Sequence, residues 1–139
     1  FAKSGFNDPI KTLADARPYR IGGVTNDAKV IWLRDNAVTN IVAVNEDKLI
    51  PPMLTLDRKE LDAGDLWITG IYAQKLVAAS ANVKDIKLVL KVNDQPLWLA
   101  CHPGLADTTI KALSDALADM KKDGAYKKIV DGYDKRFAP

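Results

Sequence analysis

The residues with the most reactive side chains are a cysteine and a histidine that follow each other in the chain. Cys101 is the single cysteine and His102 the single histidine. Neighbouring residues of a strand point to opposite faces, so His102 is poorly placed to act as a base for the Cys101 thiol. Because free cysteine is among the most buried residue types, we expect Cys101 to be a buried, unreactive thiol. We expect His102 to lie in the turn before Pro103.

Other patterns that carry chemistry are missing from the sequence. One cysteine excludes an internal disulfide and any zinc site built from several cysteines. There is no glycine-rich phosphate loop and no pair of carboxylates at a recognisable spacing. We therefore predict no catalytic residues, no metal site and no cofactor, and we expect that the protein is not an enzyme.

The composition predicts one hydrophobic core and no polyanionic partner. Of the 139 residues, 47% are apolar, which suffices for one compact core. The formal net charge is only +2, far from the dense basic patch of a nucleic-acid-binding protein, so we expect no nucleic-acid partner. No apolar run in the sequence approaches the roughly 20 residues of a membrane-spanning helix.

Apolar runs of strand length alternate with amphipathic stretches of helix length, an order typical of a parallel α/β sheet. The expected strands are Tyr19 to Val24, Asn40 to Asn45, Leu66 to Ile68, Ile86 to Val92 and Leu97 to Cys101. The last is continuously apolar, so we expect it to be deeply buried. The expected helices between them are Ala28 to Asp35, Lys48 to Leu61 with Pro51 and Pro52 in its first turn and Gly64 as its cap, and Ile71 to Ser80.

Two amphipathic helices are expected near the end of the sequence. The first repeats apolar residues at spacings of three and four, at Ile110, Leu113, Leu117 and Met120, with Asp107 or Thr108 as its cap. Gly124 breaks it. The second places Tyr126, Ile129, Val130, Tyr133 and Phe137 on one face and Lys127, Lys128, Asp131 and Lys135 on a solvated one.

Four strings of the sequence carry a resemblance to a known family. They are FAKSG (residues 1–5), IKTLADA followed by RIGGV (10–16 and 20–24), LDAGDLWI (61–68), and residues 113–120 with KDGAYKKI (122–129). Together they resemble the bacterial extracellular solute-binding proteins of family 3, the amino-acid-type periplasmic receptors. The resemblance implies a three-layer α/β sandwich of the type II periplasmic-binding-protein kind, with a mostly parallel sheet and helices on both faces.

The resemblance also implies how the chain is organised. Residues 1–92 would form the second of two lobes, and residues 93–139 a return segment whose helices pack on the first lobe or on a partner chain. The first lobe is largely absent from this sequence, so we expect either a lost N-terminal half or a homodimer formed through the C-terminal helices.

The function implied by the resemblance is the binding of a small polar molecule in a cleft between two lobes. Such a receptor is periplasmic or extracellular, has lost its signal peptide, and delivers its solute to the membrane subunits of an ABC transporter. Two alternatives stay open: the extracytoplasmic sensor domain of a signalling protein, and a lyase-type enzyme on the same fold.

The first expected ligand contact is the loop after the strand that ends at Val24. Thr25, Asn26 and Asp27 lead into the helix that starts at Ala28, and the free N–H groups of a helix N-terminus favour an anionic group. The Asp27 carboxylate can instead satisfy those donors itself, as an N-cap.

The second expected contact is Thr69 and Gly70, at the carboxyl end of the Leu66 to Ile68 strand, where ligands of open α/β sheets lie. Gly70 occupies the position at which amino-acid-binding members of the family carry an acidic residue, so amino-acid specificity is not expected unless Asp27 or Tyr72 supplies substitute contacts. Among the tryptophans, Trp67 could line a pocket or pack in the core, whereas core packing is expected of Trp32 and Trp98.

Overall fold

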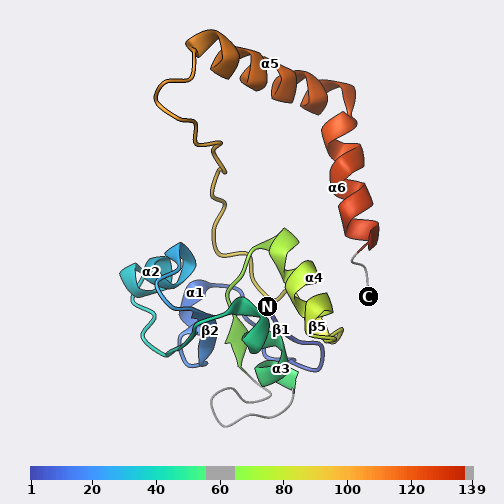
Figure 1. Ribbon diagram of the computed structural model, residues 1–139. Coiled ribbons are helices and arrows are strands. Elements are labelled where there is room, and N and C mark those ends of the chain that lie inside the picture. Colours follow the sequence, from blue (N-terminus) through green and yellow to red (C-terminus); the bar gives the residue numbers. More distant parts are fainter. Residues whose placement is uncertain (56–64, 137–139) are drawn as a thin grey trace. The chain divides into compact units, whose positions relative to one another are not determined.

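The structure is a computed structural model that describes residues 1–55 and 65–136. The chain divides into two units, one from Phe1 to Asn93 and one that begins at Asp94. In Figure 1 the first unit runs from blue to yellow and the second is orange to red. Sequence analysis places the division after residue 92, and each unit is described below by itself.

The first unit has an α/β fold, as predicted. Its elements in chain order are β1 (Ala2–Lys3), α1 (Leu13–Ala16), β2 (Ile21–Val24), α2 (Ala28–Asp35), β3 (Ile41–Val44), the 3₁₀ turn η1 (Asp47–Leu49), α3 (Ile50–Thr55), β4 (Leu66–Trp67), α4 (Ile71–Ser80) and β5 (Ile86–Lys87). The helices α2 and α4 have the bounds that periodicity predicts, and four of the strands, β2, β3, β4 and β5, lie within predicted ones.

Strand β2 is the centre of a parallel three-stranded sheet, with the order β3-β2-β4. A two-stranded antiparallel ladder of β1 and β5 continues it. The two are joined because the Trp67 N–H donates to the Phe1 carbonyl at 2.8 Å, and the Phe1 nitrogen donates to the Trp67 carbonyl at 2.9 Å. This reciprocal exchange is the pattern of an antiparallel pair, so the sheet is mixed.

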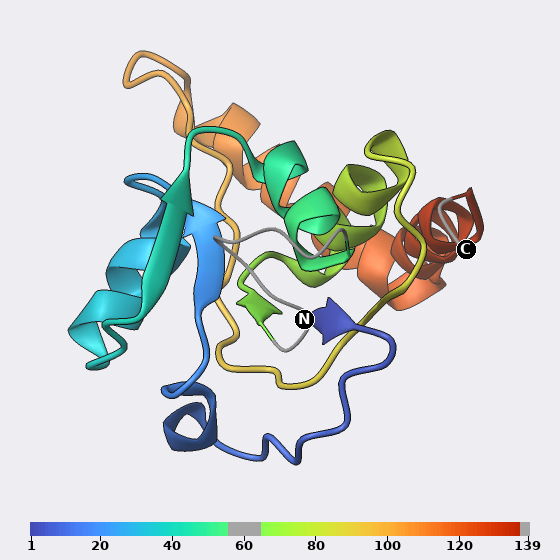
Figure 2. The ribbon, with the colours of Figure 1, turned by 90° about the horizontal axis from the view of Figure 1, so that it is seen from below.

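Helices cover both faces of the small sheet, because successive strand residues point to opposite sides. On one face, Ile21, Ile41 and Leu66 pack with Leu33 of α2. On the other, Val42, Val44 and Trp67 pack with residues of α3 and α4, among them Ile50, Leu54 and Val77. Figure 2 shows α2 on one side of β2 and β3, with α3 and α4 on the other.

The ends of α2 and α4 follow one pattern. After each helix the chain turns through a residue in the left-handed region, Ala37 with a φ of 58° and Asn82 with a φ of 56°. In both, the N–H of the next residue reaches back to the helix, Val38 to the Leu33 carbonyl at 3.0 Å and Val83 to the Ala78 carbonyl at 2.9 Å. These are Schellman ends, which glycine and then asparagine favour, so alanine at position 37 is strained.

The predicted strand from Leu97 to Cys101 is wrong. No residue of this run lies in a strand, and Leu97 and Trp98 are 97% and 85% exposed. The predicted burial of Cys101 and Trp98 is therefore also wrong, whereas Trp32 packs against the core of the first unit as predicted. An apolar run becomes a strand only when a neighbour satisfies its backbone, and no described strand pairs with this one.

Three other predictions differ in detail. Of Ile86 to Val92, only the first two residues form β5, because its partner β1 is two residues long. Before α3 the chain forms η1, and the predicted continuation over 56–61 and the cap at Gly64 lie outside the described residues. The N-cap of the first C-terminal helix is Ala106, without a side-chain bond, since Asp107 is already helical.

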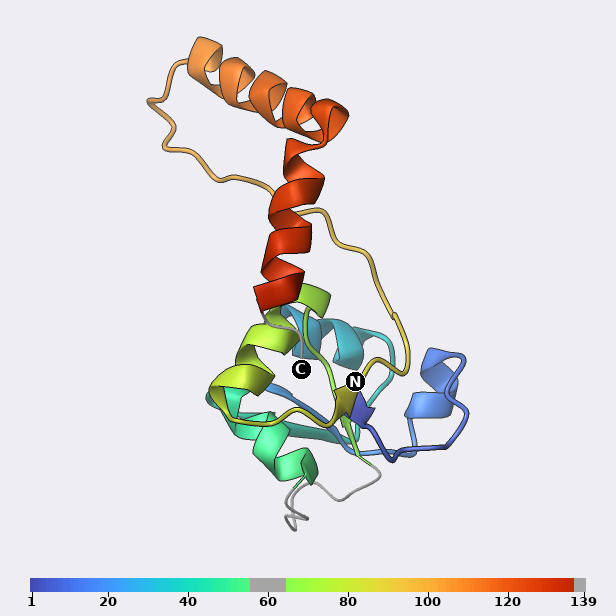
Figure 3. The ribbon, with the colours of Figure 1, turned by 90° about the vertical axis from the view of Figure 1, so that its right-hand side faces the viewer.

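The second unit consists of an irregular segment and two helices, α5 (Asp107–Asp123) and α6 (Ala125–Arg136), which Figure 3 shows meeting at a sharp bend. The break is at Gly124, whose φ of 86° suits glycine, as predicted. Apolar residues of α5, among them Leu113 and Leu117, remain exposed. Within the described residues, no helix combines the length and the apolar character needed to cross a membrane.

Candidate functional site

The strand order places the predicted ligand contacts next to each other. From β2 the chain goes to β3 on one side and returns to β4 on the other, so the β2/β4 boundary is a topological switch point. Open α/β sheets bind ligands outside the carboxyl ends of strands at such a point. Gly22 pairs with Trp67, and the Ile68 N–H still donates to the Gly22 carbonyl at 3.0 Å, so β2 and β4 run parallel and adjacent up to the end of β4. The loop that starts at Thr25 and the loop that starts at Thr69 therefore leave the sheet side by side.

We call this edge of the first unit the switch-point site. It comprises the loop residues after β2, β3 and β4, namely Thr25, Asn26, Asp27, Asp47, Thr69 and Gly70.

The β2 loop is fixed to the neighbouring strand by Thr25. Both its backbone N–H and its Oγ1 donate to the Val44 carbonyl, at 2.8 Å and 3.1 Å. Asn26 then takes a φ of 60°, a left-handed conformation that asparagine tolerates better than most residues. The chain can thereby turn sharply from β2 into α2.

Asp27 caps α2, which confirms the structural alternative in the sequence analysis. Its Oδ1 accepts from the Lys29 N–H at 2.8 Å, and its Oδ2 accepts from the Lys29 Nζ at 2.8 Å. Partial burial would raise the pKa of Asp27, but the hydrogen bonds and charge of Lys29 outweigh it and lower that pKa below its ordinary 3.8. The N-terminus of α2 is thus already occupied by a carboxylate of the chain itself.

The close approach of α2 to β2 depends on Gly23. A Cβ at this position would lie 2.4 Å from the Val30 Cγ2 and 3.2 Å from the Ile68 Cγ2. A side chain there would push α2 away from the strand, and the Thr25 to Asp27 loop would move with the helix.

The β4 loop differs from the β2 loop because its helix has no side-chain cap. Gly70 is the N-cap of α4 and can supply no side-chain acceptor. The first N–H groups of α4 have no acceptor within the helix. Tyr72, in the first turn of α4, is exposed. This helix end can therefore donate hydrogen bonds to a bound molecule.

Asp47 is a site residue that the sequence analysis missed. Its Oδ1 accepts from the Trp67 Nε1 at 2.9 Å, and its Oδ2 accepts from the Thr69 Oγ1 at 3.2 Å. The carboxylate thus ties the loop after β3 to the end of β4. The sequence did contain one signal for Asp47, because it is a polar residue shortly after a strand, like Thr25 and Thr69.

Trp67 lies in the core, since it is 1% exposed and packs with Ile50 and Leu54. Its ring therefore does not line the open surface of the site. Only its indole N–H points to the site, through the bond to Asp47.

The reactive pair of the sequence analysis shows no catalytic geometry. Cys101 is exposed, and the His102 Nδ1 accepts from the Gly104 N–H at 3.0 Å, as in the expected turn before Pro103. Within residues 1–55 and 65–136, no group of three or more histidine, cysteine, aspartate or glutamate side chains could hold a metal ion.

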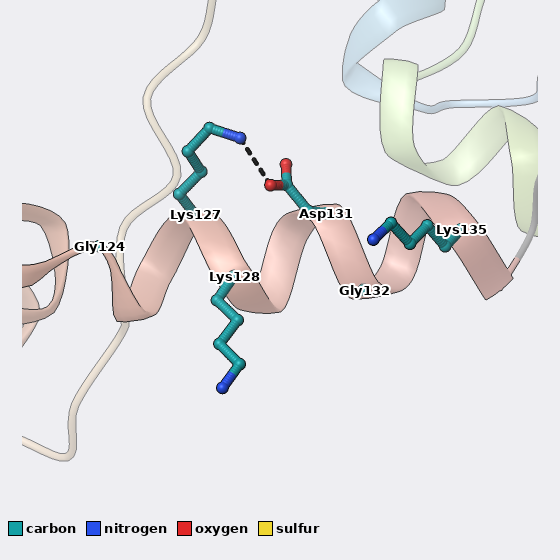
Figure 4. Close-up of a pocket in the computed structure, with 6 residues that line it drawn as sticks. All are labelled: Gly124, Lys127, Lys128, Asp131, Gly132 and Lys135. Carbon is teal, nitrogen blue, oxygen red and sulfur yellow. Dashed lines mark hydrogen bonds and ion pairs between the residues drawn. The ribbon is translucent and has the colours of Figure 1, made fainter.

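A shallow depression runs along α6, and Figure 4 shows the residues that line it: Gly124, Lys127, Lys128, Asp131, Gly132 and Lys135. One of its three lysines pairs with Asp131 one turn away. The charged side chains lie on the face that periodicity predicts to be solvated. A few lysines on one helix face are typical of a solvent-exposed surface, and none of the predicted ligand contacts lines this depression.

Comparison with known proteins adds no family to this geometry: no family model, no curated protein and no solved structure matches the chain.

Proposed function

We propose that this chain is part of an extracytoplasmic solute-binding protein, similar to the bacterial solute-binding proteins of family 3, and that the switch-point site supplies one side of its cleft. The observation that carries the proposal is the arrangement of Thr25 to Asp27 and of Thr69 and Gly70 at the carboxyl ends of two adjacent parallel strands. This is the edge at which open α/β sheets bind small molecules.

The polar groups at this edge suit reversible binding. Hydroxyls, a carboxylate and the uncapped N-terminus of α4 can hydrogen-bond a small polar molecule without any covalent step. The helices on both faces of the sheet support the three-layer sandwich that the resemblance implies. Delivery of the solute to ABC transporter subunits in the periplasm, or outside the cell, is part of the same proposal.

The test is a binding screen of the full chain. Small polar solutes that are cationic, neutral, zwitterionic or anionic are added, and amide and indole N–H correlations are followed by NMR. We expect at least one solute to shift the resonances of Thr25, Thr69 and Gly70 together with the indole N–H of Trp67, in a saturable way.

The control is an equally polar surface at the other end of the sheet. Thr39 is exposed and precedes β3, so its resonance should not move with the solute. A screen in which no solute class shifts the switch-point resonances, or in which Thr39 responds as strongly as Thr69, would show that this edge is not a binding site.

A further inference from the structure

The two threonine hydroxyl groups of the switch-point site already donate their protons to acceptors within the chain. A threonine hydroxyl has one proton to donate and two lone pairs to accept with. The Thr25 Oγ1 lies 3.1 Å from the Val44 carbonyl, which has no proton, so Thr25 must be the donor in this bond. The Thr69 Oγ1 lies 3.2 Å from the Asp47 Oδ2, and an ionised carboxylate also only accepts. While these two bonds are kept, both hydroxyls can only accept a hydrogen bond from a bound molecule.

Asp47 is an acceptor with capacity left. A carboxylate offers about four acceptor positions, and the described residues fill two of them, with the Trp67 indole N–H and the Thr69 hydroxyl. Both of these donors are neutral. Within residues 1–55 and 65–136, no lysine or arginine forms an ion pair with Asp47. By contrast, Asp27 and Asp65 are each paired with a cation of the chain.

From this pattern we infer the chemistry of the solute, an inference that rests on the proposed function. The solute presents N–H or O–H donors to Thr25, Thr69 and Asp47, so it is an amine or a polyhydroxyl compound and not an anion without donors. A solute acceptor placed against Thr25, Thr69 and Asp47 would bring its lone pairs against theirs. Polar groups that lose water without gaining a partner weaken binding. A negative charge would also be repelled by Asp47.

The two helix ends agree with this choice. The N-terminus of α2 has its own carboxylate, Asp27, and gives an anion no free donors there. Within the described residues, the N-terminus of α4 has no side-chain cap, so the solute can place an acceptor there in addition to its donors. Sites that hydrogen-bond a particular substrate group reject analogues that lack it by large factors.

Three four-carbon solutes separate the possibilities: putrescine, a cationic diamine; erythritol, a neutral polyol; and succinate, a dianion without donors. The full chain is titrated with each, and the N–H resonances of Thr25, Thr69 and Gly70 and the Trp67 indole are followed by NMR. We expect putrescine, erythritol or both to shift these resonances with saturation, and succinate to leave them unchanged. Putrescine alone would assign the main contact to the Asp47 charge, and erythritol alone to the hydroxyl acceptors.

Variants show whether the effect comes from these groups. Thr69→Val, which keeps the shape but removes the acceptor, should weaken binding roughly 3- to 10-fold, and Thr69→Ser should restore it. Asp47→Asn keeps one acceptor for the Trp67 indole and should weaken putrescine binding roughly 10- to 100-fold. The matched controls are Thr39→Val and Asp35→Asn, two exposed positions outside the site. Thermal unfolding of each variant verifies that the fold is retained.

Each contrary result has a distinct meaning. If succinate saturates the site and binds more tightly than the two donors, the inferred solute chemistry is wrong but the proposed function stands. If Asp35→Asn weakens putrescine binding as much as Asp47→Asn does, the diamine binds only to general surface charge and the inference fails. If none of the three solutes shifts these resonances, the inferred solute chemistry is wrong, and the wider screen of solute classes decides the proposed function.

Discussion

Gly23→Ala is the sharpest test of how the β2 loop is positioned. The added Cβ would lie 2.4 Å from the Cγ2 of Val30, a residue that is completely buried and cannot move aside into solvent. Overpacking of this kind costs about 1–3 kcal/mol. Alanine also restricts the unfolded chain, which returns about 0.4–1 kcal/mol. We expect a net loss of about 1–2 kcal/mol in the free energy of unfolding, and each kcal/mol lowers Tm by roughly 4–8 °C in a unit of this size.

Urea denaturation measures this loss, and an unchanged slope m would show that the surface exposed on unfolding is the same in the variant and the wild type. Gly5→Ala is the matched control, because a Cβ at Gly5 would meet no atom within 4 Å. It should be neutral or slightly stabilising. In the double variant Gly23→Ala/Val30→Ala the clash is relieved. Its loss in the free energy of unfolding should therefore be smaller than the sum of the two single-variant losses, by at least about 0.5 kcal/mol. Strict additivity, or a Gly23→Ala variant as stable as Gly5→Ala, would refute the argument.

Three further changes test separate features. Ala37 has a φ of 58°, so Ala37→Gly should raise the free energy of unfolding by about 0.5–1 kcal/mol in urea denaturation. Arg20 lies 2.8 Å from Asp65, and their side chains are 27% and 9% exposed, so Arg20→Met should cost about 1.5–3 kcal/mol in the same assay. The double variant Arg20→Met/Asp65→Leu should recover most of that loss, whereas additive losses would contradict a buried ion pair. Partial burial would raise the pKa of Asp27, but Lys29 outweighs this effect and lowers it. The ionised Asp27 carboxylate therefore contributes its full stabilisation above the ordinary pKa of 3.8. This stabilisation is lost as the pH falls through the lower pKa of the folded state. The Tm difference between the wild type and Asp27→Asn, which keeps a capping side chain, should therefore shrink from about pH 5 to about pH 2; a constant difference would contradict the sign of the shift.

Local pattern was enough to predict the elements on which the site is built. The helices α2 and α4 and the strands β2 and β3 each have a clear period, and Asp27 stands where an N-cap belongs. Chain order then placed Thr25 and Thr69 at strand ends. Their proximity follows from the strand order β3-β2-β4, a tertiary property that no single segment encodes.

The wrong and missing predictions have the same physical origin. Leu97 to Cys101 has the composition of a buried strand, but burial requires a partner, which periodicity does not reveal. Asp47 was missed because its role depends on bonds to Trp67 and Thr69, which lie 20 and 22 residues away in the chain. Whether Trp67 lines a pocket or packs in the core was likewise decided by register, since its ring points to the face covered by α3 and α4.

The two ends of strands β2 and β4 differ in how their charges are balanced. At the amino ends, Arg20 and Asp65 neutralise each other within the chain, so that end serves stability. At the carboxyl ends, Asp47 is oriented by two neutral donors that fix its position without cancelling its charge. Hydrogen bonds from neutral donors leave the negative charge of the carboxylate largely uncompensated. They also remove its rotational freedom before any solute arrives. A donor-bearing solute would therefore meet an acceptor that is already in place, which is how preorganised polar sites gain affinity.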